Sequence, residues 1–160
     1  MFRNTVALLA VAGLVICPSM ASAQSQTEQE VTQTIIDAYE YGNTHLQVPN
    51  DRSQHGSLEF WSSGGLLQEI PQSGGAEEYD ALNIQPKHIS VATLVEGQAA
   101  VAHYYAEGSM KPKGYPAVSN YLVRVTRVYV KEDGAWKIRS AHYSAVLGGL
   151  GTSQTARITP

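Results

Sequence analysis

The sequence predicts an α+β fold, in which an N-terminal helix packs in a curved antiparallel sheet that forms a cone with one pocket. The first observation is a single strong helical pattern of apolar residues, within residues 27–43. The second is that most of the chain after residue 57 consists of β-branched and aromatic runs separated by turn residues. The third is size, since 160 residues that are 43% hydrophobic suit one domain with a buried core. A sheet curved around a helix leaves a cavity where a small molecule can bind.

The first 23 residues are typical of a secretory signal peptide. Arg3 supplies a basic start, residues 6–16 are almost entirely apolar, and Ala21-Ser22-Ala23 is a cleavage site of the small-x-small kind. The apolar run is shorter than the roughly 20 residues that a membrane-spanning helix needs. We therefore expect cleavage after Ala23 and a mature protein, without a membrane span, that is periplasmic or extracellular.

The composition argues against several classes of function. The chain carries 11 Lys and Arg against 14 Asp and Glu, and this acidic balance is unsuited to binding nucleic acid. Its one cysteine, Cys17, lies in the expected signal peptide, so no disulfide can form within the mature chain. The five histidines lack the paired spacing of metal ligands, and no phosphate-binding or dinucleotide-binding motif occurs. We therefore expect neither a metal nor a cofactor.

One segment near the start of the mature chain combines a helix start, an apolar face and a stop. Thr27 and Glu30 have the spacing of a capping box, in which each side chain bonds a backbone N–H of the other residue. Gly42 and Asn43 are residues that commonly end helices. Residues 45–56 are polar, contain a proline, and are expected to form a loop. The apolar face recurs at steps of three and four residues and consists of Val31, Ile35, Ala38 and Tyr39.

The rest of the chain contains six runs with the composition of strands. Asp133-Gly134 between two alternating runs is a strong hairpin signal. The segment 108–116 is rich in glycine, proline and lysine and is expected to be a mobile crossover. Residues 148–160 lack periodicity, so we assign 24–147 to the domain and the remainder to a flexible C-terminal tail. The expected strands are 58–61, 66–70, 88–94, 98–107, 121–130 and 136–146.

Side chains alternate along a strand, so each strand offers only two sets of residues to the cavity. In the last strand Lys137 and Arg139 mark the solvent face. The opposite face, expected to point inward, consists of Trp136, Ile138, Ser140, His142 and Ser144. In strand 98–107 the more polar and aromatic set is expected inward, namely Val101, His103, Tyr105 and Glu107. In strand 121–130 each face carries an arginine, Arg124 or Arg127, so alternation alone does not choose between them.

The last two strands and their turn carry a specific set of residues, which are Thr126-Arg127-Val128-Tyr129, Lys131, Asp133-Gly134, Trp136 and His142-Tyr143-Ser144. This set resembles the nuclear-transport-factor-like superfamily, and within it the SnoaL-like branch that includes the association domain of calcium/calmodulin-dependent kinase II. Members of that branch show Thr-Arg-Val-Trp, a basic stretch, Asp-Gly-x-Trp and His-x-Ser at these spacings. The helix and the Phe60-Trp61-x-x-Gly-Gly segment also fit. Because the superfamily hosts enzymes, binding modules and assembly modules, the resemblance implies a fold more strongly than a chemistry.

The resemblance implies that Arg127 points into the pocket, where its guanidinium can meet a carboxylate. Tyr121 lies on the same face of that strand by alternation and is then expected inward as well. The second pocket arginine of the family falls on Tyr105 here, so one guanidinium stands where the family has two. The resemblance also implies a homodimer.

The first functional hypothesis is that the pocket binds a small, partly apolar molecule that can carry a carboxylate. Arg127 would fix the anion, and aromatic side chains would contact the apolar part. The expected ligand-binding residues are Arg127, Tyr105, Tyr121, Trp61, Tyr39 and Ser144.

Two alternatives remain open. In one, the protein is a cofactor-free isomerase, cyclase or hydrolase in which His142 or His103 moves a proton. Arg127 or Tyr105 would then stabilise an oxyanion. In the other, the protein is a dimeric assembly module that uses the outer face of the sheet, where Arg124 and Tyr143 are expected.

Overall fold

We describe the fold from a computed structural model, which describes residues 24–74, 77–146, 149 and 151. The expected signal peptide and most of the expected C-terminal tail lie outside these residues. The elements in chain order are α1 (Gln26–His45), β1 (Ser57–Phe60), β2 (Gln68–Ile70), β3 (Tyr79–Val95), β4 (Ala99–Pro112), β5 (Val118–Glu132) and β6 (Ala135–Ala145). Within the described part of the chain, no helix is both long and apolar enough to cross a membrane.

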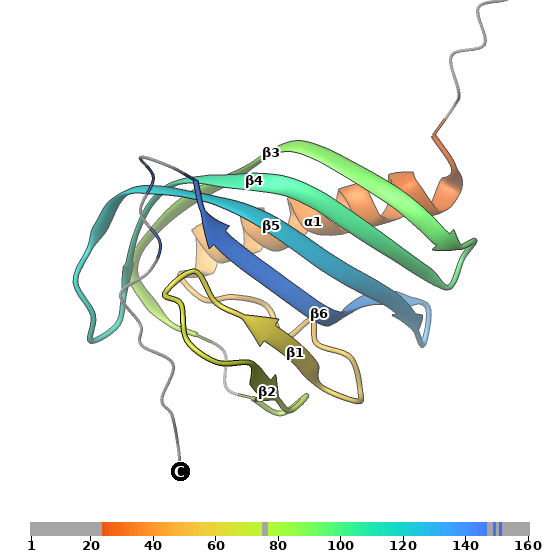
Figure 1. Cartoon of the computed structure of the whole chain (residues 1–160), viewed down its shortest axis with the longest axis horizontal. Helices are drawn as coiled ribbons and strands as arrows, with labels where there is room; N and C mark the ends of the chain where they lie inside the picture. The colour runs from red at the N-terminus through yellow and green to blue at the C-terminus, as the bar shows by residue number, and fades with distance from the viewer. Residues whose placement is uncertain (1–23, 75–76, 147–148, 150, 152–160) are drawn as a thin grey trace, which may run out of the picture.

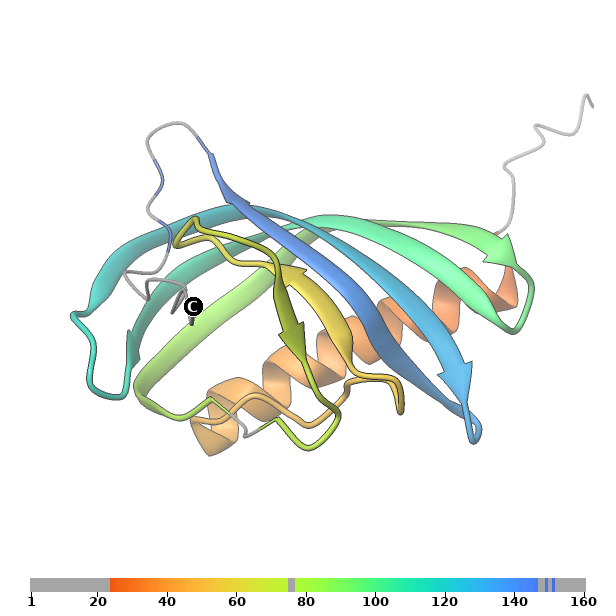
Figure 2. The same cartoon turned by 60° about the horizontal axis from the view of Figure 1, so that its bottom comes forward.

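The six strands form one curved sheet in the order β2-β1-β6-β5-β4-β3 (Figure 1). Figure 2 shows α1 lying along the concave side of the long strands. The predicted α+β fold, with an N-terminal helix packed in a curved sheet, is therefore confirmed. The sheet is mixed rather than wholly antiparallel, because β1 pairs in parallel with β6. That pairing brings the loop between α1 and β1 next to β6, where Asp51 and Ser53 bond the backbone of Ile138.

The N-cap of α1 lies two residues before the predicted cap, Thr27. Ser25 is the N-cap, and its hydroxyl and the Glu28 carboxylate form the capping box. Thr27 instead makes a tertiary contact, since its hydroxyl accepts a 2.7 Å hydrogen bond from the N–H of Gly97 in the β3–β4 turn. The helix also continues past Gly42, which is buried against Leu82 and does not end it. A glycine here allows close packing of α1 on β3.

Strands β3 and β4 are longer than the sequence indicated. The crossover predicted for 108–116 is shorter, because β4 continues to Pro112. The register of β4 with β5 changes after Gly108, whose φ is +144°, while its pairing with β3 continues without a shift. A β-carbon at this position would lie 2.0 Å from the carbonyl oxygen of Asn83 on β3. The glycine therefore lets the two strands stay paired through the bend, where any side chain would separate them.

Strand β6 contains one extra residue relative to β5. Val128 pairs with Ser140 and Tyr129 pairs with Ile138, so Arg139 has no counterpart on the neighbouring strand. A bulge of this kind shifts the alternation of side chains from that residue onward. Before it, Trp136 and Ile138 are buried as predicted; after it, the inward residues are Ala141 and Tyr143 instead of His142 and Ser144.

The core lies between α1 and the concave face of β3 to β6. Val31 and Ile35 of α1 are fully buried. The β4 residues on this face are mostly alanines, which allow the helix to approach the sheet closely. They are Ala100, Ala102 and Ala106, together with Tyr104.

Glu30 joins the first turns of α1 to the β5–β6 hairpin, and it gives a testable contribution to stability. Its carboxylate accepts hydrogen bonds of 2.6 Å from Lys131 and 2.9 Å from the Trp136 indole, which lower its pKa from 4.5 to about 2. A lowered pKa stabilises the fold above pH 4.5, and this stabilisation disappears as the pH falls to about 2. We expect Glu30→Gln to lower the denaturation midpoint at pH 7 and to differ little from wild type near pH 2.

The matched control is Glu40→Gln, which changes an exposed glutamate of the same helix. Urea titrations followed by circular dichroism at pH 7, 4 and 2 make the comparison. An equal loss of stability at every pH would contradict the assigned role of the Glu30 carboxylate.

Candidate functional site

A cavity of about 140 Å³ lies between α1, the loop that follows it, β1 and the concave face of the sheet. By the same kind of measure an engineered cavity of about 150 Å³ holds benzene, so this space suits a molecule with one small ring. Its walls combine apolar and aromatic surface with a few charged groups. The main side chains are those of Ala38, Tyr39, Val48, Asp51, Arg52, Glu59, Trp61, Glu77, Tyr79, Leu82, Ile84, Met110, Tyr121, Arg127, Ile138 and Tyr143.

Arg127 of β5 lies on the cavity wall and is surrounded by tyrosines. Its Nε and Nη2 donate to the Tyr143 hydroxyl at 3.2 and 2.7 Å, and its Nη1 donates to the Tyr129 hydroxyl at 3.4 Å. The guanidinium also lies 5.6–6.0 Å from the ring centroids of Tyr39, Tyr104 and Tyr143, within the range of cation–π contact. These contacts hold the arginine in place without a carboxylate partner within salt-bridge distance among the described residues.

The Tyr143 hydroxyl is the polar group that this arrangement offers to the cavity. It accepts both bonds from Arg127, so its own proton remains available for an acceptor in the cavity. Burial raises the pKa of Tyr143 well above its ordinary value although Arg127 opposes the shift, so the hydroxyl stays protonated. A hydroxyl that accepts from a cation is a better donor, because the bonds polarise one another.

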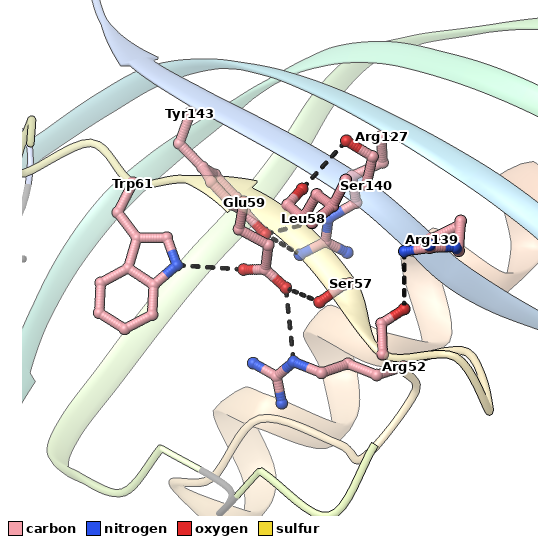
Figure 3. A network of polar contacts seen from close by, with 10 residues as sticks. Arg52, Ser57, Leu58, Glu59, Trp61, Arg127, Arg139, Ser140 and Tyr143 are labelled. Carbon is pink, nitrogen blue, oxygen red and sulfur yellow. Dashed lines mark hydrogen bonds and ion pairs between the residues drawn. The ribbon is translucent and has the colours of Figure 1, made fainter. Parts of the chain in front are cut away.

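Glu59 of β1 forms the centre of a second buried network (Figure 3). Its Oε1 accepts from Ser57 at 2.5 Å and from the Arg52 Nε at 3.4 Å, and its Oε2 accepts from the Trp61 indole at 3.1 Å. Three donors satisfy this carboxylate, which explains how a charge is accommodated at such depth. The network fixes Trp61 and Arg52 on the cavity wall.

Two further acidic residues face the cavity. Burial raises the pKa of Asp51, although the positive charges of Arg127 and Arg52 oppose the shift. Burial likewise raises the pKa of Glu77, which is opposed by a 2.8 Å hydrogen bond from the Tyr79 hydroxyl. Asp51 is held by its backbone, since its carbonyl accepts from the N–H of Ile138 at 2.8 Å. A buried acid with a raised pKa in a cavity is a candidate for proton exchange with a bound molecule.

Four of the predicted ligand-binding residues lie on the cavity wall. Arg127 and Tyr121 point inward from β5, Trp61 follows β1, and Tyr39 comes from α1. The ambiguity that alternation left in β5 is thereby decided, with Arg124 on the opposite, exposed face.

The predicted inward positions of His142 and Ser144 are wrong. The bulge at Arg139 turns both toward the outer face, where the His142 ring contacts the Phe60 ring at a centroid distance of 5.6 Å. Neither residue lines the cavity. The same bulge brings Tyr143 inward, where a place on the outer face was expected.

The predicted inward positions of His103 and Tyr105 are wrong as well. Both lie on the exposed face of β4, and His103 Nδ1 lies 3.1 Å from the Thr126 hydroxyl. Their strand is covered by α1, and contact with a helix selects the small residues of the alternate set rather than the polar ones. This strand lines the cavity through Met110, which lies on the same buried face as the alanines.

Several residues of the site escaped the sequence reasoning, chiefly Asp51, Arg52, Glu59, Glu77 and Tyr143. The polar composition of segment 45–56 predicts a loop, and its charged Asp51-Arg52 pair is the signal in the sequence that this loop contributes to a site. Among the described residues no group of three or more His, Cys, Asp and Glu side chains is placed to hold a metal ion.

Comparisons with known proteins identify the class of fold. No family model matches the sequence, and no curated protein matches it. Solved structures do match in three dimensions, and several of them are described as nuclear-transport-factor-like (NTF2-like) proteins. An NTF2-like protein of unknown function from Pseudomonas putida has 15% identity and a TM-score of 0.53, over 75% of this chain and 87% of that chain.

Two other solved structures also match this chain in fold. A proposed aromatic ring hydroxylase from Novosphingobium aromaticivorans has 14% identity and a TM-score of 0.56, over 78% of this chain and 92% of that chain. An NTF2-like protein of unknown function from Prochlorococcus has 17% identity and a TM-score of 0.50, over 76% and 94%. The chain therefore has the NTF2-like fold that the C-terminal motifs indicated. At these identities the likeness concerns the fold, and the chemistry has to be argued from the cavity.

The raised pKa values of Asp51 and Glu77 predict how stability depends on pH. Folded protein binds protons at these groups more tightly than the unfolded chain does, so their contribution to stability grows as the pH falls from 7 toward the raised values. Replacing either group by its amide removes the cost of a buried charge. We expect Asp51→Asn and Glu77→Gln each to raise the free energy of unfolding at pH 7, by about 1.4 kcal/mol for each unit of raised pKa.

Thermal unfolding of wild type and both variants between pH 7 and 5.5 tests this. Asp37→Asn, on the exposed face of α1, serves as the control and should leave the pH profile unchanged. Loss of stability at pH 7 in both cavity variants would show that the carboxylates are favourably paired, contrary to the assignment.

Proposed function

We propose that this protein binds a small, partly apolar molecule in the cavity between α1 and the sheet. The observation that carries the proposal is the combination of a benzene-sized cavity with aromatic walls and the Tyr143 hydroxyl, which is oriented by Arg127. Trp61, Tyr39 and Tyr121 would contact the apolar part of the ligand. A few placed polar groups in a mostly apolar pocket are typical of small-molecule sites.

The polar groups give the ligand an orientation. Tyr143 would donate its proton to a carbonyl or hydroxyl oxygen of the ligand. Arg127 takes a different role from the one expected, because its three donor nitrogens already bond tyrosine hydroxyls. It would act on the ligand through Tyr143 rather than as the anion-binding group itself.

We also propose that the protein acts after export and as a homodimer. Support for export comes from the signal-peptide pattern, which ends at Ala23, two residues before the N-cap Ser25 of the first helix. Support for a dimer comes from aromatic side chains on the outer face of the sheet, where Phe60 is 44% and Tyr105 is 41% exposed. The mass of the exported chain tests signal-peptide cleavage, and its sedimentation velocity tests the homodimer.

A second candidate function is cofactor-free proton transfer, and the cavity acids favour it over the histidines. Asp51 combines burial, a raised pKa and a position near Arg127, which suit a carboxylate that accepts a proton from a bound substrate. Tyr143 would donate to the oxygen on which negative charge develops. A base and a hydrogen-bond donor in one cavity fit an isomerase that moves a proton next to a carbonyl group. His142 and His103 are replaced in this proposal by Asp51.

Binding can be tested by thermal shift of residues 24–160 against small aromatic ketones, alcohols and carboxylates. A ligand at 100 times its dissociation constant stabilises by about 2.7 kcal/mol, a shift of several degrees. We expect Tyr143→Phe, which retains the ring and removes the hydroxyl, to weaken binding tenfold or more. Tyr105→Phe makes the same chemical change on the exposed face of the sheet and should leave binding unchanged. Equal affinities for the two variants would refute the role of the hydroxyl.

Proton transfer can be tested by deuterium incorporation into small cyclic ketones in D₂O, followed by NMR. We expect Asp51→Asn to reduce the rate by about 10²- to 10⁴-fold, whereas His142→Gln and His103→Gln retain it. The rate should fall as the pH falls through the raised pKa of Asp51, because a protonated carboxyl group accepts no proton. Exchange no faster than in buffer would reject the enzymatic candidate and leave the binding proposal standing.

A further inference from the structure

Arg52 is a buried cation whose hydrogen-bonding capacity is only partly used. It is 9% exposed and lines the cavity. Its Nε donates to Glu59, whereas neither terminal nitrogen has a hydrogen-bond partner among the residues that the structure describes. Figure 3 shows the two terminal nitrogens pointing away from the Glu59 carboxylate. The two terminal nitrogens are not among the buried side-chain atoms without a partner in the described residues, so they keep exposed surface, and the cavity that Arg52 lines gives a ligand access to them.

The position of this guanidinium is determined from two sides. The backbone around Arg52 is bound to β6, since the N–H of Ser53 donates to the Ile138 carbonyl at 2.9 Å and the Asp51 carbonyl accepts from the N–H of Ile138. The side chain is held at Nε by Glu59, which Ser57 and the Trp61 indole orient in turn. The remaining edge of the guanidinium is therefore pre-organised, which reduces the entropy that a ligand would have to remove.

We propose that the two terminal nitrogens of Arg52 bind a carboxylate group of the ligand as a bidentate pair. Two parallel N–H donors match the two oxygens of a carboxylate in spacing and plane. The inference rests on the proposed ligand-binding function and adds the chemical class of one end of the ligand. Arg52 thereby takes the role that sequence reasoning gave to Arg127, and Tyr143 binds an oxygen elsewhere on the same molecule.

The charges that face the cavity permit an anion. They are those of Arg52, Arg127, Asp51, Glu59 and Glu77, and the tyrosines Tyr39, Tyr79, Tyr121 and Tyr143 add neutral hydroxyls. Burial disfavours the charged forms of Asp51 and Glu77. With both protonated, the two arginines exceed the one remaining carboxylate of Glu59, and a monocarboxylate neutralises the cavity. Binding of a carboxylate should therefore tighten as the pH falls toward these pKa values, while a neutral ligand should respond little.

Benzoate and benzamide make a matched pair of probes, because they differ mainly in charge. Dissociation constants for residues 24–160 can be measured by ligand-detected NMR at pH 6 and 8, where benzoate stays ionised. We expect benzoate to bind at least tenfold more tightly than benzamide at pH 6, and this preference should not be larger at pH 8. Benzamide binding as well as benzoate at pH 6 would overturn the carboxylate inference alone, whereas failure of both probes to bind would overturn the proposed function with it.

Variants separate recognition from structure. Arg52→Lys keeps the positive charge beside Glu59 but lacks the planar pair of donors, and it should cut the benzoate preference tenfold or more while benzamide binding is retained. Arg124→Lys, on the exposed face of the sheet, is the control. Should Arg52→Lys fail to fold, a crystal structure of the wild-type protein with benzoate decides, because the benzoate carboxylate must then lie within hydrogen-bond distance of both terminal nitrogens of Arg52. A carboxylate bound elsewhere in the cavity would overturn the proposal.

Discussion

The extra residue Arg139 in β6 is the constraint on which the cavity depends. Downstream of it the side chains of β6 exchange faces, so that Tyr143 meets Arg127 while His142 turns outward. Residues at the bulge also hold the segment that begins β1, because Arg139 donates to the Gly56 carbonyl and Ser140 to the Leu58 carbonyl. One inserted residue therefore both selects the chemistry of the cavity wall and positions the segment that closes it.

The segment between α1 and β1 forms part of the cavity wall in addition to connecting the two elements. Its backbone bonds β6 on either side of Arg52, and its side chains supply both an acid and a cation to the cavity. Carrying charged groups on a loop that is tied to a strand gives them the precision of a rigid element. The cost appears as buried charge, which lowers stability near neutral pH and marks the cavity as a place where function outweighs stability.

The two networks divide the cavity into ends of different character. At one end Arg127 bonds tyrosine hydroxyls through each of its three nitrogens and presents a neutral donor, Tyr143. At the other end Arg52 is oriented by Glu59 and keeps its two terminal nitrogens available. Two arginines of equal charge thus serve different tasks because their partners differ. This division suits a ligand with an anionic group at one end and a neutral oxygen at the other.

Local patterns in the sequence determined the α+β class, the amphipathic face of α1 and the β5–β6 turn at Asp133-Gly134. They also determined the inward aromatic residues Trp61 and Tyr39, and the motif that placed Arg127 inward. Contacts between distant segments decided the rest. Thr27 bonds Gly97 instead of capping the helix, and packing against α1 buries the alanines of β4. The pairing of β6 with β5 leaves Arg139 as a bulge. The physical reason is that alternation along a strand is a local property, whereas register and the covered face depend on neighbouring elements, and a shift of one residue exchanges every side chain that follows.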